Sequence, residues 1–163
     1  MLFQRASELA IRAALFLARQ EPGKLSPVHE IAAHSGVSKA YLSKVLQRLT
    51  GAGLVRSFRG PGKGMELGQP PSAITVAALI RAVEGVQTEQ ACVFGLRRCT
   101  EETPCALHQE WIPIRAALCE LLEKTTLADL TAAARDDASK ATGDLLAGLH
   151  VPVTAGPRGG RQS

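Results

Sequence analysis

The sequence lacks the patterns that mark most enzymes and membrane proteins. It has no Cys-x-x-Cys pair, no glycine-rich phosphate-binding fingerprint and no nucleophile–base arrangement that spacing alone reveals. No apolar stretch reaches the length of a membrane span, and the N-terminus carries no signal-peptide cleavage pattern. We therefore expect a cytoplasmic protein that is not an enzyme and has no membrane partner.

The chain is also short and carries only a modest excess of positive charge. Its 163 residues, 45% of them hydrophobic, can bury one core but leave little material for a second. The 19 Lys and Arg residues outnumber the 15 Asp and Glu residues, giving a formal net charge of +4. This balance suits a nucleic-acid partner but does not identify one.

Cysteines are few, but three of the four lie close together. Cys92, Cys99 and Cys105 fall within 14 residues and are separated by six and five residues. A reducing compartment disfavours structural disulfides, and the spacing differs from the short paired spacing of a zinc finger. Three thiolates at this spacing can surround one iron–sulfur cluster. We expect Cys119, which lies on an apolar helix, to be a small buried hydrophobe.

Helical periodicity appears three times in the first 50 residues. A scaffold helix is expected over residues 5–20. Ser26 then reads as an N-cap with Pro27 at the first helical position, and that second helix ends at Gly36. Ser38 caps a third helix. Two short helices around a glycine turn predict a helix-turn-helix.

Two short strands are expected next, over residues 54–58 and 65–67. The loop between them is rich in glycine, and Arg56, Arg59 and Lys63 bring positive charge to its surface. Ser72 is expected to cap a helix that runs to Val83. The predicted fold class is mainly α with a small β-wing: a winged helix-turn-helix followed by a long C-terminal dimerisation helix.

The helix after the cysteines carries an apolar stripe with spacings of three and four. A contact between subunits explains this stripe best, although a core face within one chain is the alternative. Pro113 either kinks this helix or marks its start. Thr126 and Asp129 form a capping box for a last helix that ends near residue 134. The stripe consists of Trp111, Ile114, Leu118 and Leu121.

Several of these segments together resemble a known family. The N-terminal helix, the segment IAAHSGVSKAYLSKVLQRLTGAGLVRSFRGPGKG, the cysteine loop and the closing TTLADL are similar to the IscR/NsrR-type winged-helix regulators, over roughly residues 1–134. The resemblance implies a homodimer that binds a palindromic operator in double-stranded DNA. It also implies a 2Fe-2S or 4Fe-4S cluster that senses redox state, nitric oxide or iron–sulfur status. RirA and CymR types are related, and the CymR type lacks the cluster.

The resemblance divides the chain into three parts. Residues 1–85 form the winged-helix DNA-binding domain, and residues 86–134 hold the cysteine loop and the dimerisation helices. Residues 135–163, with many small, polar, glycine and proline residues, are expected to be a disordered tail.

The resemblance also implies a fourth cluster ligand but leaves its identity open. It can be a histidine three residues after the third cysteine, here His108, or an acidic residue in the first helix of the partner subunit, here Glu8. Three-residue spacing on a helix would bring His108 close to Cys105. Glu8 ranks slightly ahead, because a glutamate on an otherwise apolar helix is harder to explain as a surface residue. A related member type uses a histidine from the DNA-binding half, and His34 is the candidate.

A dimer of this type would place two recognition helices in successive major grooves. By the same resemblance the wing follows the minor groove, although Lys63 and Met65 depart from the usual glycine and aromatic there. The residues expected to contact DNA are Ser38, Lys39, Tyr41, Ser43, Lys44 and Gln47 on the helix and Arg56, Arg59, Gly60, Pro61, Gly62 and Lys63 on the wing. The expected function is a transcriptional regulator, a repressor, controlled by the cluster. The alternative is a winged-helix regulator whose cysteines hold zinc or act as a thiol switch.

Overall fold

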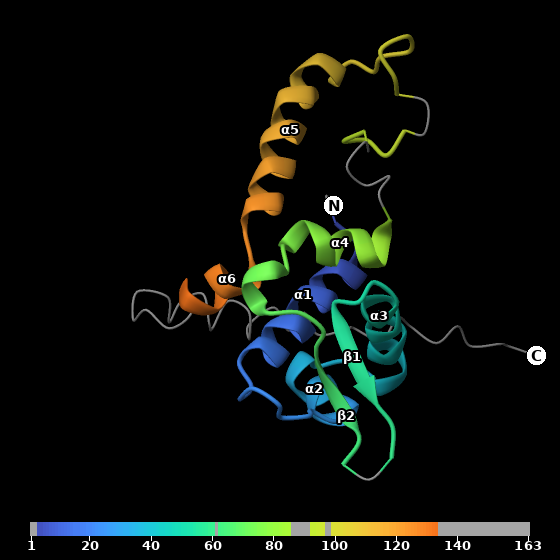
Figure 1. The fold of residues 1–163 in the computed structure, drawn as a ribbon. Coiled ribbons are helices and arrows are strands. Elements are labelled where there is room, and N and C mark those ends of the chain that lie inside the picture. Colours follow the sequence, from blue (N-terminus) through green and yellow to red (C-terminus); the bar gives the residue numbers. More distant parts are fainter. Residues whose placement is uncertain (1–2, 61, 86–91, 97–98, 134–163) are drawn as a thin grey trace, which may run out of the picture.

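The computed structural model describes residues 3–60, 62–85, 92–96 and 99–133. Pro61, which was expected to contact DNA, lies outside the described residues. The tail over residues 135–163, which was expected to be disordered, also lies outside them. None of the helices in these ranges is long and apolar enough to cross a membrane. The elements follow the order α1 (Arg5–Ala18), α2 (Val28–Ser35), α3 (Lys39–Gly51), β1 (Val55–Phe58), β2 (Gly64–Leu67), η1 (Pro71–Ala73), α4 (Val76–Glu84), α5 (His108–Lys124) and α6 (Leu127–Ala133), as Figure 1 shows.

The helix-turn-helix predicted from the sequence is confirmed by α2 and α3. Gly36 ends α2 with a φ of 64°, a left-handed conformation that glycine adopts without strain. The Ser38 side chain caps α3, since its Oγ accepts a hydrogen bond from the Tyr41 backbone N–H at 3.3 Å. This cap fixes where the recognition helix begins.

The N-cap expected at Ser26 is wrong. Pro27 is the N-cap residue of α2, and the helix begins at Val28. Ser26 instead forms an antiparallel bridge with Met65, with both backbone N···O distances at 2.9 Å. Pairing with the wing therefore holds Ser26 in extended conformation, and a helix cannot start there.

The wing is a two-stranded antiparallel hairpin. Strand β1 pairs with β2 so that Val55 lies opposite Leu67 and Phe58 lies opposite Gly64. Each strand is within one residue of its predicted start. The hairpin projects beside α3 on the same side of the molecule (Figure 1).

The cap expected at Ser72 is also wrong, because Ser72 lies inside η1. Thr75 caps α4 instead, and its Oγ1 accepts from the Ala78 N–H at 3.1 Å. The backbone of this segment pairs with the chain before α6: Thr75 forms a bridge with Thr126, and the Leu127 N–H donates to Ile74 at 2.9 Å. This long-range pairing keeps residues 74 and 75 extended and delays the helix.

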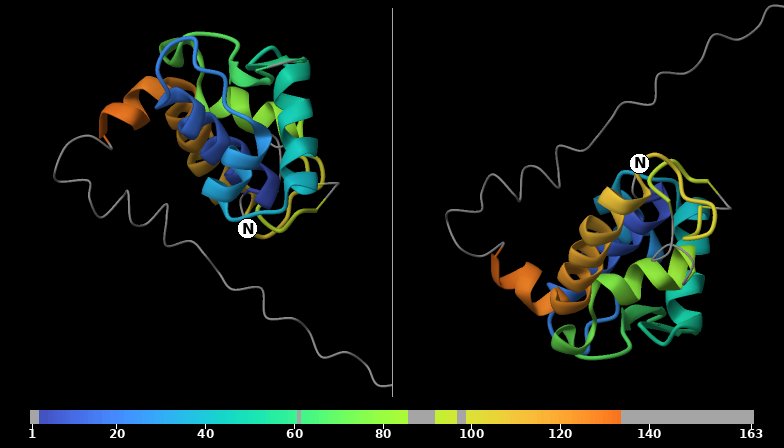
Figure 2. Two further views of the ribbon diagram at one scale, coloured as in Figure 1. Left: turned by 90° about the horizontal axis from the view of Figure 1, so that it is seen from below. Right: turned by 90° about the horizontal axis from the view of Figure 1, so that it is seen from above.

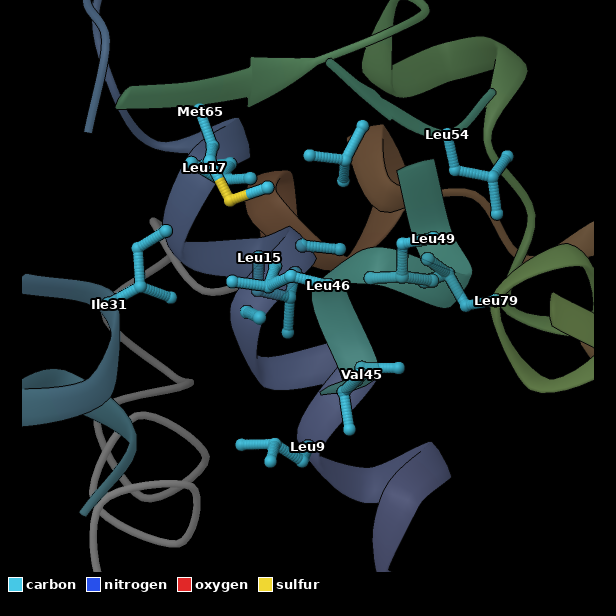
Figure 3. Close-up of a cluster of buried hydrophobic side chains, with 14 of the residues drawn as sticks. Leu9, Leu15, Leu17, Ile31, Val45, Leu46, Leu49, Leu54, Met65 and Leu79 are labelled. Carbon is cyan, nitrogen blue, oxygen red and sulfur yellow. The ribbon is translucent and has the colours of Figure 1, made fainter. Parts of the chain in front are cut away.

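The hydrophobic core surrounds α1, which packs against α2, α3, α4 and α6. Figure 3 shows side chains from α1, α3, α4 and the wing meeting in this core. Leu42, Leu46 and Leu49 of α3 are each at most 1% exposed. Burying a leucine of this kind stabilises a fold by about 1.5–3 kcal/mol. The inner face of α3 is thus rigidly held, and its outer face is left free.

Helix α5 stands away from this core (Figure 1). His108 is the only residue of α5 that is buried. Pro113 lies inside the helix and does not mark its start, because α5 begins at His108. The predicted capping box of α6 is confirmed: the Thr126 N–H donates to Asp129 Oδ2 at 2.8 Å, and the Asp129 N–H donates to Thr126 Oγ1 at 3.2 Å. Figure 2 shows α6 beside α1, on the side away from α3.

Candidate metal centre and nucleic-acid interface

Three thiols converge where the chain enters α5. The Sγ atoms of Cys92, Cys99 and Cys105 all lie within 4.8 Å of one another, and Cys92 Sγ is 3.7 Å from Cys105 Sγ. A tight turn helps to fold the loop, since the Gly95 N–H donates to the Cys92 carbonyl at 2.8 Å and Gly95 has a φ of 70°. All three cysteines are free thiols. Their sulfurs are close enough to bind one metal group together.

The surroundings of the three thiols differ in their effect on ionisation. The backbone N–H groups of Phe94 and Leu96 donate to Cys92 and lower its pKa, in spite of its burial. A hydrogen bond from the Cys105 backbone favours the Cys99 thiolate, but burial and the two neighbouring thiols outweigh it and raise the pKa of Cys99. Of these two thiols, Cys92 is the more readily ionised. A bound cation would offset the repulsion among three thiolates at this distance.

His108 lies next to one member of the thiol group, Cys99. It is the first residue of α5 and is 6% exposed, and its Nδ1 lies 3.1 Å from Cys99 Sγ. The Nε2 atom is buried and has no hydrogen-bond partner within the described part of the chain. Buried ring nitrogens are normally satisfied, so an unpaired one beside three thiols fits a site that binds a further group. Three thiolates and an imidazole suit an iron–sulfur cluster or a soft metal ion.

The other two candidate ligands lie elsewhere in a single chain. Glu8 is on α1, where its carboxylate is 2.8 Å from the Arg12 guanidinium. His34 is exposed at the end of α2, and its ring centroid is 5.0 Å from that of Phe16. Among the described residues, the group of close metal-ligating atoms consists of the three cysteines alone. Ligation by Glu8 would require a second copy of the chain, as the resemblance implies.

Cys119 is not part of this group, and in one chain it is partly exposed, not buried as expected. The reason is that α5 stands away from the core, so no second layer covers it. Trp111 and Leu118 are likewise partly exposed, and Ile114 and Leu121 are 58% and 61% exposed. The apolar stripe of α5 is therefore not a core face of one chain.

The outer face of α3 and the wing form the second candidate site. Ser43 is partly exposed, and its hydroxyl donates to the Lys39 carbonyl at 2.8 Å. On the wing, Arg56 pairs with Glu66 at 2.8 Å. Of the residues predicted to contact DNA, Ser38, Lys39, Tyr41, Lys44, Gln47, Arg56, Arg59, Gly60, Gly62 and Lys63 are exposed.

Two residues that the sequence did not single out anchor the end of α4. Arg48, on α3, donates from Nη1 to the Val83 carbonyl in the last turn of α4. The Glu84 carboxylate accepts from the Gln4 backbone N–H at 2.7 Å and from the hydroxyl of Ser7, which is fully buried. The end of α4 is therefore bonded to the recognition helix and to the start of α1. No local pattern signals this, because both partners are distant in sequence.

Comparison with known proteins gives a consistent result along most of the chain. A family model described as Rrf2, iron-dependent transcriptional regulator, matches residues 3–133. The HTH-type transcriptional regulator IscR of Yersinia pestis is 35% identical over 121 residues, which cover 74% of this chain and 73% of IscR. NsrR of Bacillus subtilis is 32% identical over 125 residues, which cover 76% of this chain and 86% of NsrR. These relatives are regulators and not enzymes, as expected.

Solved structures show the same fold. The structure of CymR, the global cysteine regulator of B. subtilis, has a TM-score of 0.66 and 32% identity, covering 80% of this chain and 95% of CymR. The structure of IscR from T. potens has a TM-score of 0.64 and 27% identity, covering 80% of this chain and 86% of that one.

Proposed function

The chain belongs to the Rrf2 family of transcriptional regulators, and from this premise we propose that it binds operator DNA under the control of an iron–sulfur cluster held in its cysteine loop. The observation that carries the proposal is the meeting of three thiol sulfurs within 4.8 Å beside a buried imidazole. Relatives named IscR and NsrR support a regulator, while the CymR structures support the fold without deciding what the thiols bind.

The residues present fit such a cluster. Cys92, Cys99 and Cys105 would hold it as thiolates, and His108 would supply the fourth ligand from the same chain. The lowered pKa of Cys92 favours the ionised form that ligation requires. The donor set accepts either a two-iron or a four-iron cluster. When bound, a cluster supplies iron and sulfide that oxidants or nitric oxide can attack. Glu8 from a second copy is the competing fourth ligand.

The exposed stripe of α5 supports a homodimer. Ile114 and Leu121 lie seven residues apart on one face of α5 and are 58% and 61% exposed, and Leu107, the residue before the helix, is 44% exposed. Two such stripes packed together would remove these side chains from water, as in a coiled-coil seam. A two-fold dimer would present two α3 helices to the half-sites of a palindromic operator in adjacent major grooves, with the two wings along the minor groove. We expect a regulator that occupies such a site to act as a repressor.

The end of α4 offers a physical route between the two sites. The cysteine loop starts directly after Gly85, and the turn before it is bonded to α3 through Arg48 and to α1 through Glu84. A change in the loop would therefore pull on the anchor of the recognition helix. Half-site spacing is a geometric requirement, so a small rotation of α3 in both copies lowers operator affinity.

A thiol switch is the second candidate, and the short distance between Cys92 and Cys105 favours it. With a peroxide as oxidant, the Cys92 thiolate would attack one peroxide oxygen and form a sulfenic acid, releasing hydroxide or alkoxide. The Cys105 thiol would then form the disulfide and release water. An oxidised form of Staphylococcus aureus CymR, 29% identical with a TM-score of 0.66, has been solved.

An anaerobic visible spectrum, with iron and acid-labile sulfide measured on the same sample, tests the proposal. The cluster predicts sulfide-to-iron charge-transfer bands, with iron and sulfide present in equal amounts. The Cys119→Ala variant is the matched control and should keep these signals, because Cys119 lies outside the thiol group. Colourless protein that binds zinc, or that forms a Cys92–Cys105 disulfide by mass spectrometry, would replace the cluster with the second candidate.

A further inference from the structure

The wing exposes an aromatic side chain, Phe58, at the end of β1. Its side chain is 41% exposed. The residue opposite it on β2 is Gly64, which has no side chain to cover the ring. A Cβ atom at Gly64 would lie 2.9 Å from Leu25, so only glycine fits there. The cross-strand side-chain pair that usually shields an aromatic ring cannot form.

The location of Phe58 separates it from most other exposed apolar side chains. Among the described residues, the large exposed ones fall into two groups. One group occupies the cysteine loop and the stripe of α5. The other consists of Tyr41, in the first turn of α3, and Phe58, at the end of β1. Figure 1 shows α3 and β1 on the same side of the molecule.

The residues near Phe58 in the sequence of the wing carry positive charge. Residues 55–64 contain Arg56, Arg59 and Lys63 and no acidic residue. Glu66 pairs with Arg56, whereas Arg59 and Lys63 form no ion pair within the described ranges. The cores of protein–protein interfaces are depleted in charge, so an exposed ring on a hairpin that also carries two free cations suits a different partner. Stacked bases between phosphates offer that combination of apolar and negative surface.

We propose that Phe58 is an apolar wedge that inserts against a base step in the DNA minor groove while Arg59 and Lys63 hold the flanking phosphates. This inference rests on the proposed function, in which the wing contacts DNA. Wedges of this kind partly unstack a step and kink the duplex. Pyrimidine–purine steps unstack most easily, so the operator carries TA or CA/TG beneath the wing. The wing thereby selects sequence through deformability without a hydrogen bond to a base.

The test uses the full-length protein and a duplex that the protein itself selects from a random library. Binding is measured by fluorescence anisotropy, and bending by energy transfer between dyes at the duplex ends. A 2-aminopurine in the step beneath the wing reports unstacking. The variants are Phe58→Ala and Phe58→Leu, with Ser57→Ala as the exposed neighbouring control. Thermal unfolding of each variant shows whether the fold is kept.

Phe58→Ala should weaken binding about tenfold, reduce the bend and abolish the 2-aminopurine signal, because the buried ring surface is lost. Phe58→Leu should keep most of the wild-type affinity, bend and 2-aminopurine signal, and Ser57→Ala should keep all three. Replacing the flexible step by AA should weaken binding of the wild type but not of Phe58→Ala.

Three results would overturn the wedge. If Phe58→Ala binds and bends DNA like the wild type while Arg59→Ala weakens binding, the wedge is wrong and the proposed function stands. If the wild type selects no duplex at all, both the wedge and the proposed function are wrong. If Phe58→Ala changes the molar mass in solution but not the bend, the ring contacts a second copy of the chain instead of DNA.

Discussion

Helices α4 and α5 are neighbours in the fold, yet they bury their side chains to very different degrees. Five of the nine residues of α4 are buried, whereas only one of the 17 residues of α5 is. The difference extends to the parts they belong to. The wing and helices around α1 share a continuous core, while the cysteine loop and α5 leave several apolar side chains exposed.

This contrast indicates two sources of order. The DNA-reading part is complete in one chain, because its apolar side chains already find partners there. Under the proposed function, the cysteine loop and α5 would be completed from outside, by a bound metal group and by a second copy of the chain. Substitutions in the first part should therefore change the free energy of unfolding, and substitutions in the second should change cofactor content and assembly.

The largest expected effect is the loss of iron from Cys99→Ala. Two remaining thiols and His108 cannot replace the missing bond, so iron and sulfide should fall to background. The far-ultraviolet circular dichroism spectrum should still show the helices of the DNA-reading part. Cys119→Ala serves as the control, and unchanged iron in Cys99→Ala would remove this residue from the site.

The second largest effect is expected in the core. Leu49→Ala removes a fully buried side chain and should lower the free energy of unfolding by about 2–5 kcal/mol, measured by urea denaturation. Gln47→Ala, on the exposed face of the same helix, should change it by less than about 0.5 kcal/mol. Equal effects of the two substitutions would contradict the arrangement of α3.

Assembly should depend on the stripe of α5. Leu121→Asp places a charge at the proposed seam in both copies and should raise the dimer dissociation constant roughly a hundredfold, measured by analytical ultracentrifugation. Ala116→Asp puts the same charge on another exposed face of α5 and should leave the constant unchanged. Dimers that tolerate Leu121→Asp would show that another surface forms the contact.

The identity of the fourth ligand gives a smaller effect. Loss of a residue that only orients a ligand lowers metal affinity by roughly tenfold or more, and loss of the ligand itself should lower it at least as much. His108→Ala should therefore shorten the lifetime of the bound cluster in air about tenfold, followed by the decay of visible absorbance. Glu8→Gln keeps the shape of that side chain and should leave the lifetime unchanged. The reverse pattern would assign the fourth ligand to Glu8 of a second copy.

The smallest effect concerns the ion pair between α4 and α5. Arg81 donates two hydrogen bonds to Glu123, one of them at 3.3 Å, and lowers the pKa of that carboxyl. The pair thus stabilises the fold above the ordinary pKa of glutamate, and the effect is lost as the pH falls through the lowered value. Both side chains are substantially exposed, so Glu123→Gln should cost only a few tenths of a kcal/mol near neutral pH. The difference from wild type should vanish in acid, and a difference that persists there would point to packing instead.

Much of the fold could be predicted because local chemistry decided it. Ser38, Gly36 and the Thr126–Asp129 box each act within a few residues, and the structure places them as predicted. The caps predicted at Ser26 and Ser72 were wrong, because pairing with distant segments overrides the local preference of serine for capping. Ser26 pairs with Met65, and the residues after Ser72 pair with the chain before α6. A single sequence does not reveal which strand a serine will meet.

The three cysteines of the candidate site were predictable from their spacing, but the geometry around them was not. The spacing of the cysteines suggested one group of ligands, and the structure brings their sulfurs together. The sequence could not decide between His108 and Glu8 as the fourth ligand. The position of His108 depends on how an aperiodic loop folds, and that of Glu8 depends on a second copy of the chain. Arg48 resembles a DNA contact on a helical wheel, yet its guanidinium bonds to Val83. Only the packing of α4 against α3 assigns it that role.

The most direct test compares the operator affinity of cluster-loaded and cluster-free protein from one preparation. Both forms would be titrated anaerobically against the same selected duplex, with a scrambled duplex as the control for phosphate binding. Control by the cluster predicts affinities that differ by at least about fivefold, with the scrambled duplex bound equally by both forms. Equal affinity of the two forms for the selected duplex would contradict the account, because the cysteine loop would then have no influence on the recognition helix.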